Sequence, residues 1–562
     1  MGVFREIRSR NELADFLGIY RNKLTYVLYI KKVESFYNTF EIPKKNGGMR
    51  QINAPSGDLK FIQRRIAEAL WAYQQSLNSE RQIKPNLSHA FEKKKSIITN
   101  AQVHRNKYLV LNLDLESFFE SFHFGRVLGY FQKNRDFQLP YEVAVALAQL
   151  TCYQGHLPQG APSSPIITNL ICQILDMRIL KIAKKYRLDY TRYADDLTFS
   201  TNDRSFYEHS KAFLEEVERE INRAGFTINH EKTRLQLRNS RQVVTGLVVN
   251  KKVNTISDYY RSTRAMAYHL YKTGTFEIEG QIGSIQELEG RFSFIDQLDH
   301  YNNRLDEKRH TFRSLNGREK QYATFLFYKY FYANDRPLIV TEGKTDILYI
   351  KSALKKLYRK YPDLIEKRSD GTFRYKVSFF RRSKRLEYFL GISLDGAETM
   401  KNVYNYYNSK NDKEYRNYHK WFCRMGCATP KHPVILLYDN ELSSKEKPIS
   451  NMVKYAGIST EGKDFLQKNL YLKLVNNSNL YMATNPLAEG MGESEIEYLF
   501  TKETLEHRIE GRSLSLSDKY DKNKYYGKNE FSQYVFQNYT TVDFSGFRGL
   551  LDVLREIIKE YK

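Results

Sequence analysis

Runs of apolar residues with different spacing divide the chain into two regions. Residues 59–73 follow a helical pattern, whereas Tyr108 to Leu113 form a short apolar strand. This mixture continues to about residue 240 and predicts an α+β body. From about 241 to 315 the pattern becomes mostly helical and polar.

A second region is expected after Asn334-Asp335-Arg336-Pro337, because proline disfavours helix in the residue before it. Pro337 to Thr341 predict a strand, followed by Glu342-Gly343-Lys344-Thr345 and an amphipathic helix over 346–358. Pro433 to Tyr438 form another continuous apolar run, typical of a strand buried on both faces of a parallel sheet. The pattern therefore predicts an α/β domain after the α+β body.

Length and charge add constraints on domains and partners. At 562 residues the chain exceeds what one core usually supports. The 89 Lys and Arg against 65 Asp and Glu give a net charge of +24, which favours nucleic acid as a partner. The 43 Tyr and 34 Phe can stack on unpaired bases, although most such rings fill cores. The first thirty residues lack a long apolar stretch, so we expect a cytoplasmic protein without a membrane span there.

The four cysteines are too few for a disulfide framework in a chain of this length. Cys423 and Cys427, with His419 and His432 nearby, could bind zinc, but their spacing fits no common zinc pattern well. Reduced structural thiols are the better interpretation.

Three carboxylates suggest a metal site. Asp195 and Asp196 lie in a segment that is predicted to form two strands joined by a tight turn. Adjacent carboxylates repel each other, so this turn is either solvated or binds cations. Asp114 follows the strand from Tyr108 to Leu113 and supplies a third carboxylate. Such a set can hold two divalent ions about 4 Å apart for in-line phosphoryl transfer, and all-oxygen ligands favour Mg²⁺.

These motifs resemble the reverse-transcriptase family. Tyr193-Ala194-Asp195-Asp196 matches the family signature, and Leu113-Asp114-Leu115 matches its other aspartate motif. Residues 157–165, Leu-Pro-Gln-Gly-Ala-Pro-Ser-Ser-Pro, are similar to the family's template and nucleotide contact loop. Gly225-Phe226 through Glu231-Lys232-Thr233 follow in the family's order.

The resemblance implies an α+β right-hand polymerase with fingers, palm and thumb. It implies that Asp114, Asp195 and Asp196 are catalytic and hold two Mg²⁺ ions. Gln159 and Gly160 would line the pocket for the dNTP substrate. Phe119, five residues after Asp114, would abut the sugar and exclude a 2′-hydroxyl, with core packing as its alternative role.

Two shorter motifs resemble the hallmarks of retron reverse transcriptases, namely Asn100-Ala101-Gln102-Val103-His104 and Val244-Thr245-Gly246. The resemblance covers roughly residues 1–315 and implies a cognate noncoding RNA as partner, with DNA extended from a 2′-hydroxyl of an internal guanosine. The product would be branched RNA-linked DNA. The expected RNA-binding residues are Asn100, His104, Thr245, Gly246, Lys251, Lys252, Arg261 and Arg264, with a solvated basic helix as an equal alternative for the cations.

In the second region, Glu342 follows one predicted strand and Asp439 and Glu441 follow another, at the edge where α/β sheets bind ligands. Glu342 alone could simply favour the first turn of a helix. Together these residues resemble the toprim domain of topoisomerases, primases and nucleases of the overcoming-lysogenization-defect type. The family has Asp-x-Asp where this chain has Asp-x-Glu, which puts activity in doubt. The resemblance implies that Glu342, Asp439 and Glu441 are catalytic and hold one or two Mg²⁺ ions, with Glu497 as a further ligand.

The resemblances imply a Rossmann-like α/β toprim domain fused to the polymerase as a nuclease effector in anti-phage defence. The alternatives are a catalytically inactive toprim scaffold and a toprim primase or nicking partner that supplies primers. The sequence leaves open the toprim nucleic-acid substrate, the infection trigger and whether the chain forms homo-oligomers. The expected parts are fingers and palm at 1–240, a thumb and RNA-binding region at 241–315, a linker at 316–336, the toprim domain at 337–500 and a helical extension at 501–562.

Overall fold

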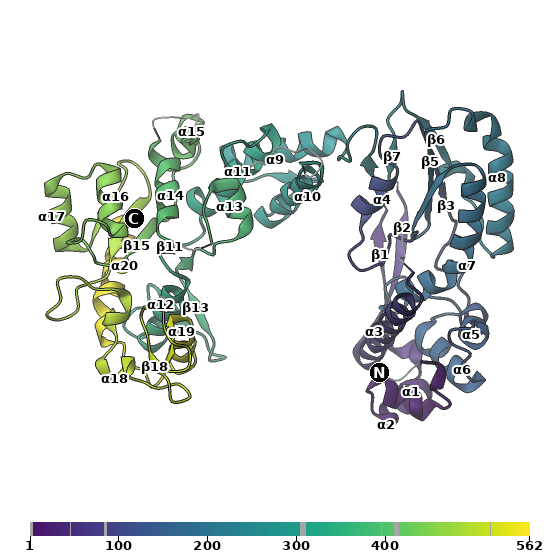
Figure 1. The fold of residues 1–562 in the computed structure, drawn as a ribbon, viewed down its shortest axis with the longest axis horizontal. Coiled ribbons are helices and arrows are strands. Elements are labelled where there is room, and N and C mark those ends of the chain that lie inside the picture. The colour runs from purple at the N-terminus through teal and green to yellow at the C-terminus, as the bar shows by residue number, and fades with distance from the viewer. Residues whose placement is uncertain are drawn as a thin grey trace. The chain divides into compact units, whose positions relative to one another are not determined.

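The protein is described by a computed structural model that covers residues 4–44, 47–83, 87–303, 311–394, 396–409, 415–517 and 519–561. The chain divides into two compact units, Met1–Ser257 and Asp258–Lys562 (Figure 1). Each unit has a sheet with helices packed against it, and each is described by itself below.

The first unit is built around a four-stranded sheet in the order β4-β5-β3-β6, in which all neighbours are antiparallel. Helix α7 and helix α8 cover one face of this sheet (Figure 1). On α8, Phe213, Val217 and Ile221 recur every four residues and are fully buried, which is the apolar stripe of an amphipathic helix. The bounds are β3 Leu109–Asp114, β4 Asp189–Tyr193, β5 Asp196–Thr201, β6 Arg234–Leu237, α7 Ser164–Lys185 and α8 Phe206–Arg223.

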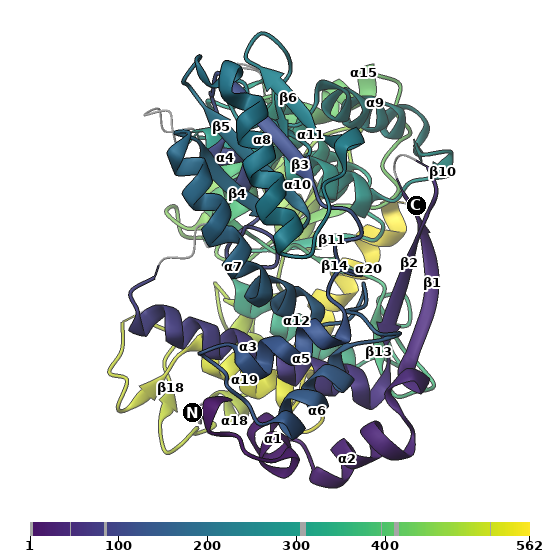
Figure 2. The same cartoon turned by 90° about the vertical axis from the view of Figure 1, so that its right-hand side faces the viewer.

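A long hairpin and a long helix accompany this sheet. Strands β1 (Tyr37–Pro43) and β2 (Met49–Pro55) pair in antiparallel register along their whole length (Figure 2). Helix α3 (Gly57–Glu80) follows and contains the helix predicted over 59–73. The remaining elements of this unit are η1 Phe4–Glu6, α1 Arg10–Leu17, α2 Arg21–Thr25, η2 Tyr26–Ile30, η3 Val33–Phe36, α4 Ile97–Val103, α5 Phe124–Lys133, α6 Tyr141–Thr151, η4 His230–Lys232, β7 Val243–Val244 and β8 Leu247–Val248.

The second unit contains a five-stranded sheet in the order β14-β11-β15-β17-β16. Strands β14, β11, β15 and β17 are parallel, and β16 pairs antiparallel at one edge. Strands β11 and β15 confirm the two apolar strands predicted from the sequence. Their bounds are β11 Leu338–Thr341, β14 Ser378–Phe379, β15 Val434–Tyr438, β16 Tyr471–Lys473 and β17 Leu480–Thr484.

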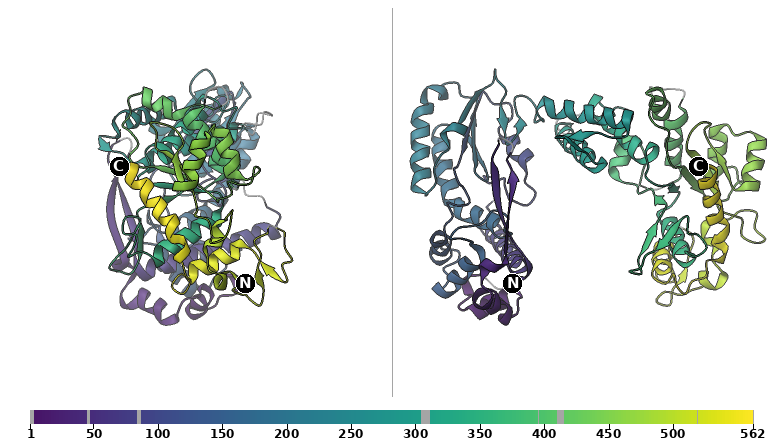
Figure 3. Two further views of the ribbon diagram at one scale, coloured as in Figure 1. Left: turned by 90° about the vertical axis from the view of Figure 1, so that its left-hand side faces the viewer. Right: turned by 180° about the vertical axis from the view of Figure 1, so that it is seen from behind.

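Both faces of this sheet are buried, which explains the continuous apolar runs of its strands. Along β15, Val434 and Leu436 belong to one core and Ile435 and Leu437 to the other, as expected from the two-residue repeat of a strand. The C-terminal helix α20 packs on the second face and is yellow in Figure 3. The helices around the sheet are α12 Lys344–Lys356, α13 Lys384–Leu390, α14 Glu398–Asn408, α15 Tyr418–Arg424, α16 Pro448–Ala456, α17 Thr460–Asn469, α18 Lys502–Leu505, α19 Lys528–Gln537 and α20 Arg548–Tyr561.

The segment 316–336, expected to be a linker, is helical and buried. Helix α11 (Gly317–Phe327) continues into η5 (Tyr328–Tyr332), and both contribute to the first core of the second unit. Its aromatic side chains provide the reason, since Phe325, Phe327 and Phe331 are fully buried. Pro337 therefore follows a core helix rather than a linker. The unit's other elements are α9 Ser257–Thr273, β9 Glu277–Ile278, β10 Gln281–Ile282, α10 Ile285–Asn303, β12 Ile365–Lys367, β13 Phe373–Tyr375, η6 Ile496–Leu499, β18 Ser513–Leu514, β19 Tyr525–Tyr526 and η7 Ser545–Phe547.

Candidate active sites

The first candidate site lies where two strands and one turn of the first unit present Asp114, Asp195 and Asp196. Asp114 at the end of β3 is the register partner of Asp196 at the start of β5. Asp195 lies in the tight turn between β4 and β5, and its backbone oxygen accepts a hydrogen bond of 3.0 Å from the Leu115 amide. The fold therefore gathers the three carboxylates from two adjacent strands and one turn.

Burial and mutual repulsion raise the pKa of two of the three carboxylates. Burial, followed by the charges of Asp195 and Asp114, raises the pKa of Asp196 to about 7. Burial and the charge of Asp114 also raise the pKa of Asp195. A cation among these groups would relieve both the desolvation and the repulsion, so the donor set suits a divalent ion with a preference for oxygen.

One cation of the chain already contacts the cluster. Lys232 Nζ lies 2.8 Å from Asp114 Oδ1. Within the described residues, no three His, Cys, Asp or Glu side chains are arranged as a finished metal site. The sequence placed Lys232 in a motif but gave no sign that its side chain would reach Asp114.

A cleft of about 570 Å³ adjoins the carboxylates and has the lining expected of a nucleotide pocket. Asp114 and Asp195 line it together with Phe119 and Gln159, so four of the predicted residues share one cleft. The Phe119 ring is half-buried and contacts Phe118 edge-on, which leaves part of it available to a ligand. Three cationic side chains line the same cleft and suit a triphosphate: Lys44, Arg50 and Lys232.

Gly160 supports the cleft without lining it. Its neighbour Gln159 accepts a hydrogen bond of 2.8 Å from the Asn53 amide of β2. Gly160 has a φ of +111°, and a Cβ there would lie 2.8 Å from Ile52 Cγ2. Only glycine permits this close approach of the loop to β2. Its role is therefore to hold the loop that carries Gln159.

Asn100 and His104, expected to bind RNA, are fully buried. Thr191 Oγ1 donates to Asn100 Oδ1 at 2.6 Å and lies 2.7 Å from His104 Nε2. His104 Nδ1 is 2.8 Å from Ser200 Oγ. These contacts place both side chains under the β4–β5 hairpin. The expectation that they contact RNA directly is therefore wrong, and both side chains support the hairpin instead. Polar residues look exposed in a sequence, and only the fold shows their burial.

The other expected RNA-binding residues are at or near the surface. Thr245 and Gly246 lie between β7 and β8 and line a cavity of about 260 Å³ that also contains Asp114 and Asp196. The remaining four are exposed cations: Lys251 and Lys252 in the first unit, and Arg261 and Arg264 on α9 of the second unit.

The second candidate site lies at the carboxyl ends of the parallel strands β11 and β15. The Asp439 amide donates a hydrogen bond of 3.1 Å to Glu342 Oε1. Both carboxylates line a cavity of about 450 Å³ together with Asp346 and Glu497. Burial raises the pKa of Glu342 to about 8 and that of Glu497 to about 7. The pKa of Asp439 is also raised, first by burial and then by the charge of Glu342.

Glu441 is placed differently from its expected partners. Its carboxylate accepts a hydrogen bond from Lys447, and its side chain is not part of the cavity lining. Two residues that the sequence did not reveal take part instead. Asp346 in the first turn of α12 is half-buried, and its Oδ2 accepts a hydrogen bond of 2.9 Å from the Gly343 amide. Lys528 of α19 lies 3.3 Å from Glu497 and also lines the cavity.

The cysteine and histidine residues considered for zinc do not form a metal centre among the described residues. Cys423 Sγ lies 3.9 Å from each ring nitrogen of His419, which stacks on Tyr407. Separately, among the described residues we find no helix with the length and apolar character needed to cross a membrane.

Comparisons with known proteins agree with the first site. The family described as reverse transcriptase (RNA-dependent DNA polymerase) matches residues 42–266. The retron Ec86 reverse transcriptase of Escherichia coli is 35% identical over 280 residues, which cover 49% of this chain and 80% of that protein. The retron Mx162 reverse transcriptase of Myxococcus xanthus is 33% identical over 324 residues, which cover 52% of this chain and 64% of that protein. The chain therefore spans slightly less than two thirds of the Mx162 enzyme's length.

Among solved structures, the telomerase of Candida albicans in complex with a TWJ fragment of telomeric RNA aligns with a TM-score of 0.30 at 11% identity. That alignment covers 52% of this chain and 60% of the telomerase chain. The identity to the Ec86 enzyme over most of that protein's length is decisive, together with the match of residues 42–266. This chain belongs to the family of retron reverse transcriptases.

Proposed function

We propose that the first unit is an RNA-directed DNA polymerase that copies a retron's noncoding RNA into branched RNA-linked DNA. The observation that carries the proposal is the pairing of Asp114 with Asp196 beside a cleft lined by Phe119 and Gln159. A carboxylate cluster next to a basic, nucleotide-sized cleft fits phosphoryl transfer between a bound triphosphate and a nucleic-acid end.

The side chains of the cleft have separable roles in this proposal. Asp114, Asp195 and Asp196 would hold Mg²⁺, which when bound activates the attacking hydroxyl and stabilises the leaving oxygen. Lys44 and Arg50 bind phosphate oxygens of the incoming dNTP. The guanidinium of Arg50 can do so through two parallel hydrogen bonds, and the ammonium of Lys44 acts as a point charge. The half-buried Phe119 ring lies against the sugar and discriminates against a 2′-hydroxyl.

Primer extension with defined templates tests this activity. The single variants Asp195→Asn and Asp196→Asn should lower RNA-directed DNA synthesis about a thousandfold or more. Asp203→Asn is the matched control, since Asp203 lies just after β5, outside the residues that line the cleft. Unchanged synthesis in the first two variants would contradict the proposal.

The RNA partner is proposed from the family relationship and from the surface cations. Lys251 and Lys252 in one unit and Arg261 and Arg264 in the other would contact RNA phosphates, whose negative charge dominates the affinity. Purification of the protein from cells that carry its neighbouring locus should yield DNA joined to RNA through a 2′ branch. Unbranched DNA only would support a generic polymerase.

For the second unit we propose a toprim-type nuclease that depends on Mg²⁺. The observation in favour is that Glu342 and Asp439 follow adjacent parallel strands and share a cavity with Asp346 and Glu497. Glu497 is buried and the other three carboxylates are half-buried, so their mutual repulsion is costly without a cation. The arrangement fits a site for one or two ions. Lys528 provides a fixed positive charge at the same cavity, where it would hold a phosphate of the nucleic-acid substrate.

The nuclease proposal includes a role against phage, which rests on the resemblance to fused retron effectors alone. Its rivals are an inactive scaffold and a primase or nicking partner that supplies primers. Incubation with labelled RNA and DNA substrates and Mg²⁺ distinguishes them: cleavage that Glu342→Gln abolishes supports the nuclease, nicks extended by the first unit support the primer supplier, and no reaction supports the scaffold. Phage challenge of cells that express Glu342→Gln tests the defence role, because unchanged protection would remove it.

A further inference from the structure

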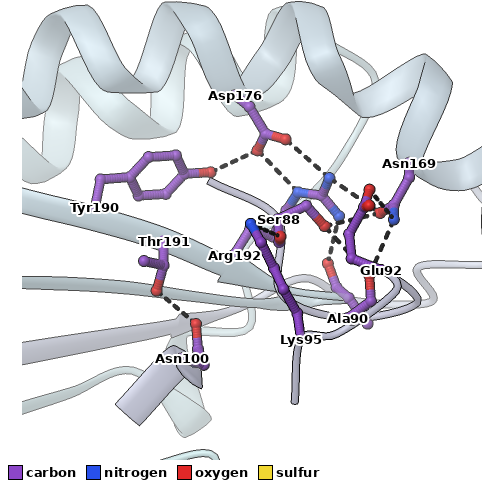
Figure 4. A network of polar contacts seen from close by, with 11 residues as sticks. Ser88, Ala90, Glu92, Lys95, Asn100, Asn169, Asp176, Tyr190, Thr191 and Arg192 are labelled. Carbon is purple, nitrogen blue, oxygen red and sulfur yellow. Dashed lines mark hydrogen bonds and ion pairs between the residues drawn. The ribbon is translucent and has the colours of Figure 1, made fainter. Parts of the chain in front are cut away.

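Behind the catalytic turn of the first unit lies a buried ion pair that the proposed chemistry does not use (Figure 4). The side chain of Arg192 on β4 is 0% exposed, and that of Asp176 on α7 is 5% exposed. Arg192 Nε donates to Asp176 Oδ1 at 2.8 Å, and Nη2 donates to Oδ2 at 2.8 Å. The two parallel hydrogen bonds fix the plane of the guanidinium relative to α7.

The guanidinium also reaches the turn that carries Asp195. Nη1 of Arg192 donates a hydrogen bond of 3.2 Å to the backbone oxygen of Ala194, the residue immediately before Asp195. Ala194 has a φ of +56°, in the left-handed region that residues with a Cβ rarely adopt. A conformation of this kind persists only where the surroundings hold it. Arg192, which Asp176 anchors to helix α7, supplies one such contact.

Further groups hold the ion pair itself in place. Tyr190 donates from its hydroxyl to Asp176 Oδ1 at 2.8 Å (Figure 4). Asn169 Oδ1 accepts from Arg192 Nη2 at 3.4 Å, while Asn169 Nδ2 donates to the Ala90 backbone oxygen at 2.9 Å. The network therefore links α7, β4 and the segment before α4 around one guanidinium.

The opposite face of β4 is held separately. Successive residues of a strand point to opposite faces, and Thr191 accordingly contacts Asn100 rather than the ion pair (Figure 4). Hydrogen bonds to buried side chains thus hold both faces of the strand just before the catalytic turn.

We propose that Arg192, held by Asp176, is a positioning residue that sets the turn geometry of Asp195 and Asp196 for metal binding. The inference rests on the polymerase function proposed above and adds what orients its carboxylates. Stability alone does not require this pair, because apolar residues of similar volume usually replace a buried ion pair without loss. An apolar side chain, however, could not donate to the Ala194 carbonyl.

The test separates folding from positioning with a triple variant, Asp176→Leu, Tyr190→Phe and Arg192→Met. This variant removes the buried charges and the tyrosine hydroxyl together, so no charge is left without its partner. Its thermal unfolding midpoint should stay close to that of the wild type. Its kcat for single-nucleotide addition should fall about tenfold to a hundredfold, because a misplacement of 1 Å at a reacting centre can cost about a hundredfold. Its KM for dNTP should change less than about threefold, since the residues that line the cleft are untouched.

Metal binding provides a readout that does not depend on activity. Mn²⁺ titration followed by electron paramagnetic resonance, in an Asp439→Asn background that weakens the other site, should show weaker binding by the triple variant. Arg178→Met is the matched control on the same helix. Arg178 pairs with Glu220 at a distance of 3.5 Å, and this pair does not include the turn that carries Asp195. This control should retain both kcat and Mn²⁺ affinity.

A triple variant that folds, extends primers at the wild-type kcat and binds Mn²⁺ normally would overturn the proposal. If the triple variant does not fold, Arg192→Lys decides, since lysine keeps the charge but cannot donate to Asp176 and Ala194 in the same fork geometry. A wild-type kcat and Mn²⁺ affinity in Arg192→Lys would likewise overturn it. If the wild type makes no DNA on RNA, the polymerase function fails instead, and the Mn²⁺ comparison still tests the positioning role.

Discussion

The ammonium nitrogen of Lys232 lies 2.8 Å from the carboxylate of Asp114, although 118 positions separate the two residues in the chain. Lys232 ends the short helix η4, and Asp114 ends the central strand β3. The backbone oxygen of Asp114 also accepts a hydrogen bond of 2.8 Å from the Asn229 amide, so the segment with Lys232 is docked on that strand. The lysine is thereby held at the cleft that Asp114 and Asp195 also line, where in the proposed polymerase it would face the phosphates of the incoming dNTP.

Replacing Lys232 by methionine should lower kcat for nucleotide addition about tenfold to a hundredfold, because a fixed charge at the reacting phosphate is lost. Lys232→Arg should retain more activity than Lys232→Met. Rapid-quench measurement of single-nucleotide addition gives these rates. Lys211→Met, an exposed position on α8, serves as control. Equal rates for Lys232→Met and the wild type would contradict the role.

Phe119→Ala should relax discrimination between dNTP and rNTP. The half-buried ring lines the cleft, and its removal opens space where a 2′-hydroxyl would otherwise clash. We expect the ratio of kcat/KM for dNTP over rNTP to fall about tenfold or more. Phe91→Ala is a suitable control, since that ring lies 6.3 Å from Phe119 but is not part of the cleft lining. A ratio that is unchanged in Phe119→Ala would assign the ring to packing alone.

Gly160→Ala should destabilise the first unit by about 1–3 kcal/mol. The new Cβ would meet Ile52 Cγ2 at 2.8 Å and the Asn53 backbone oxygen at 3.1 Å, in addition to the strain of a φ of +111°. Gly155→Ala separates these effects, because Gly155 has a φ of +83° but a Cβ added there would meet no atom within 4 Å. Denaturant unfolding should show the larger loss in Gly160→Ala, and equal losses would remove the steric argument.

His104 should make stability depend on pH. Burial lowers the pKa of His104 to about 3, whereas in the unfolded chain it titrates near 6.5. Between these values the unfolded state binds more protons, so the contribution is fully present above pH 6.5 and is lost as the pH falls to about 3. Over that window one group contributes a slope of up to about 1.4 kcal/mol per pH unit.

Replacing His104 by glutamine should therefore flatten the dependence of unfolding free energy on pH, measured by urea denaturation from pH 7 to pH 4. His209→Gln is the control at an exposed position of α8 and should leave the slope unchanged. A slope in His104→Gln equal to that of the wild type would show that another group dominates the acid response.

In the second unit, Asp439→Asn should raise the stability of the metal-free protein and reduce the stabilisation by Mg²⁺. Without Mg²⁺ it should raise stability by about 1 kcal/mol, because one of several mutually repelling carboxylates is neutralised. It should also weaken the rise in melting temperature that Mg²⁺ produces. Glu441→Gln should change the Mg²⁺ response much less, since Glu441 contacts Lys447 and does not line the cavity. If Glu441→Gln weakened the Mg²⁺-dependent rise in melting temperature more than Asp439→Asn, Glu441 would be the more important metal ligand.

Strands β3 and β15 could be predicted because each is a largely apolar run that leads into an acidic residue. Tyr108 to Leu113 anticipated β3, and Pro433 to Tyr438 anticipated β15, each to within one residue at either end. The carboxylates of Asp114 and Asp439 followed as the first polar groups after these strands. A pattern of this kind is local, so a sequence reveals it directly.

Contacts between distant segments could not be predicted in the same way. Asn100 and His104 are polar, and nothing local shows that the β4–β5 hairpin covers them. Lys528 reaches Glu497 only because α19 packs against α12, which no spacing in the sequence encodes. The aromatic helix before Pro337 was expected to be a linker, because its burial depends on the helices packed around it.

The C-terminal segment of the second unit has a consequence for how the protein can be divided. Helix α20 covers one face of the five-stranded sheet, and Lys528 of α19 lines the acidic cavity. A shortened gene that stops near residue 500 would encode neither α20, which covers one face of the sheet, nor Lys528, which is a cation of the cavity. Any transplant of this module into another protein must therefore carry the chain through Tyr561.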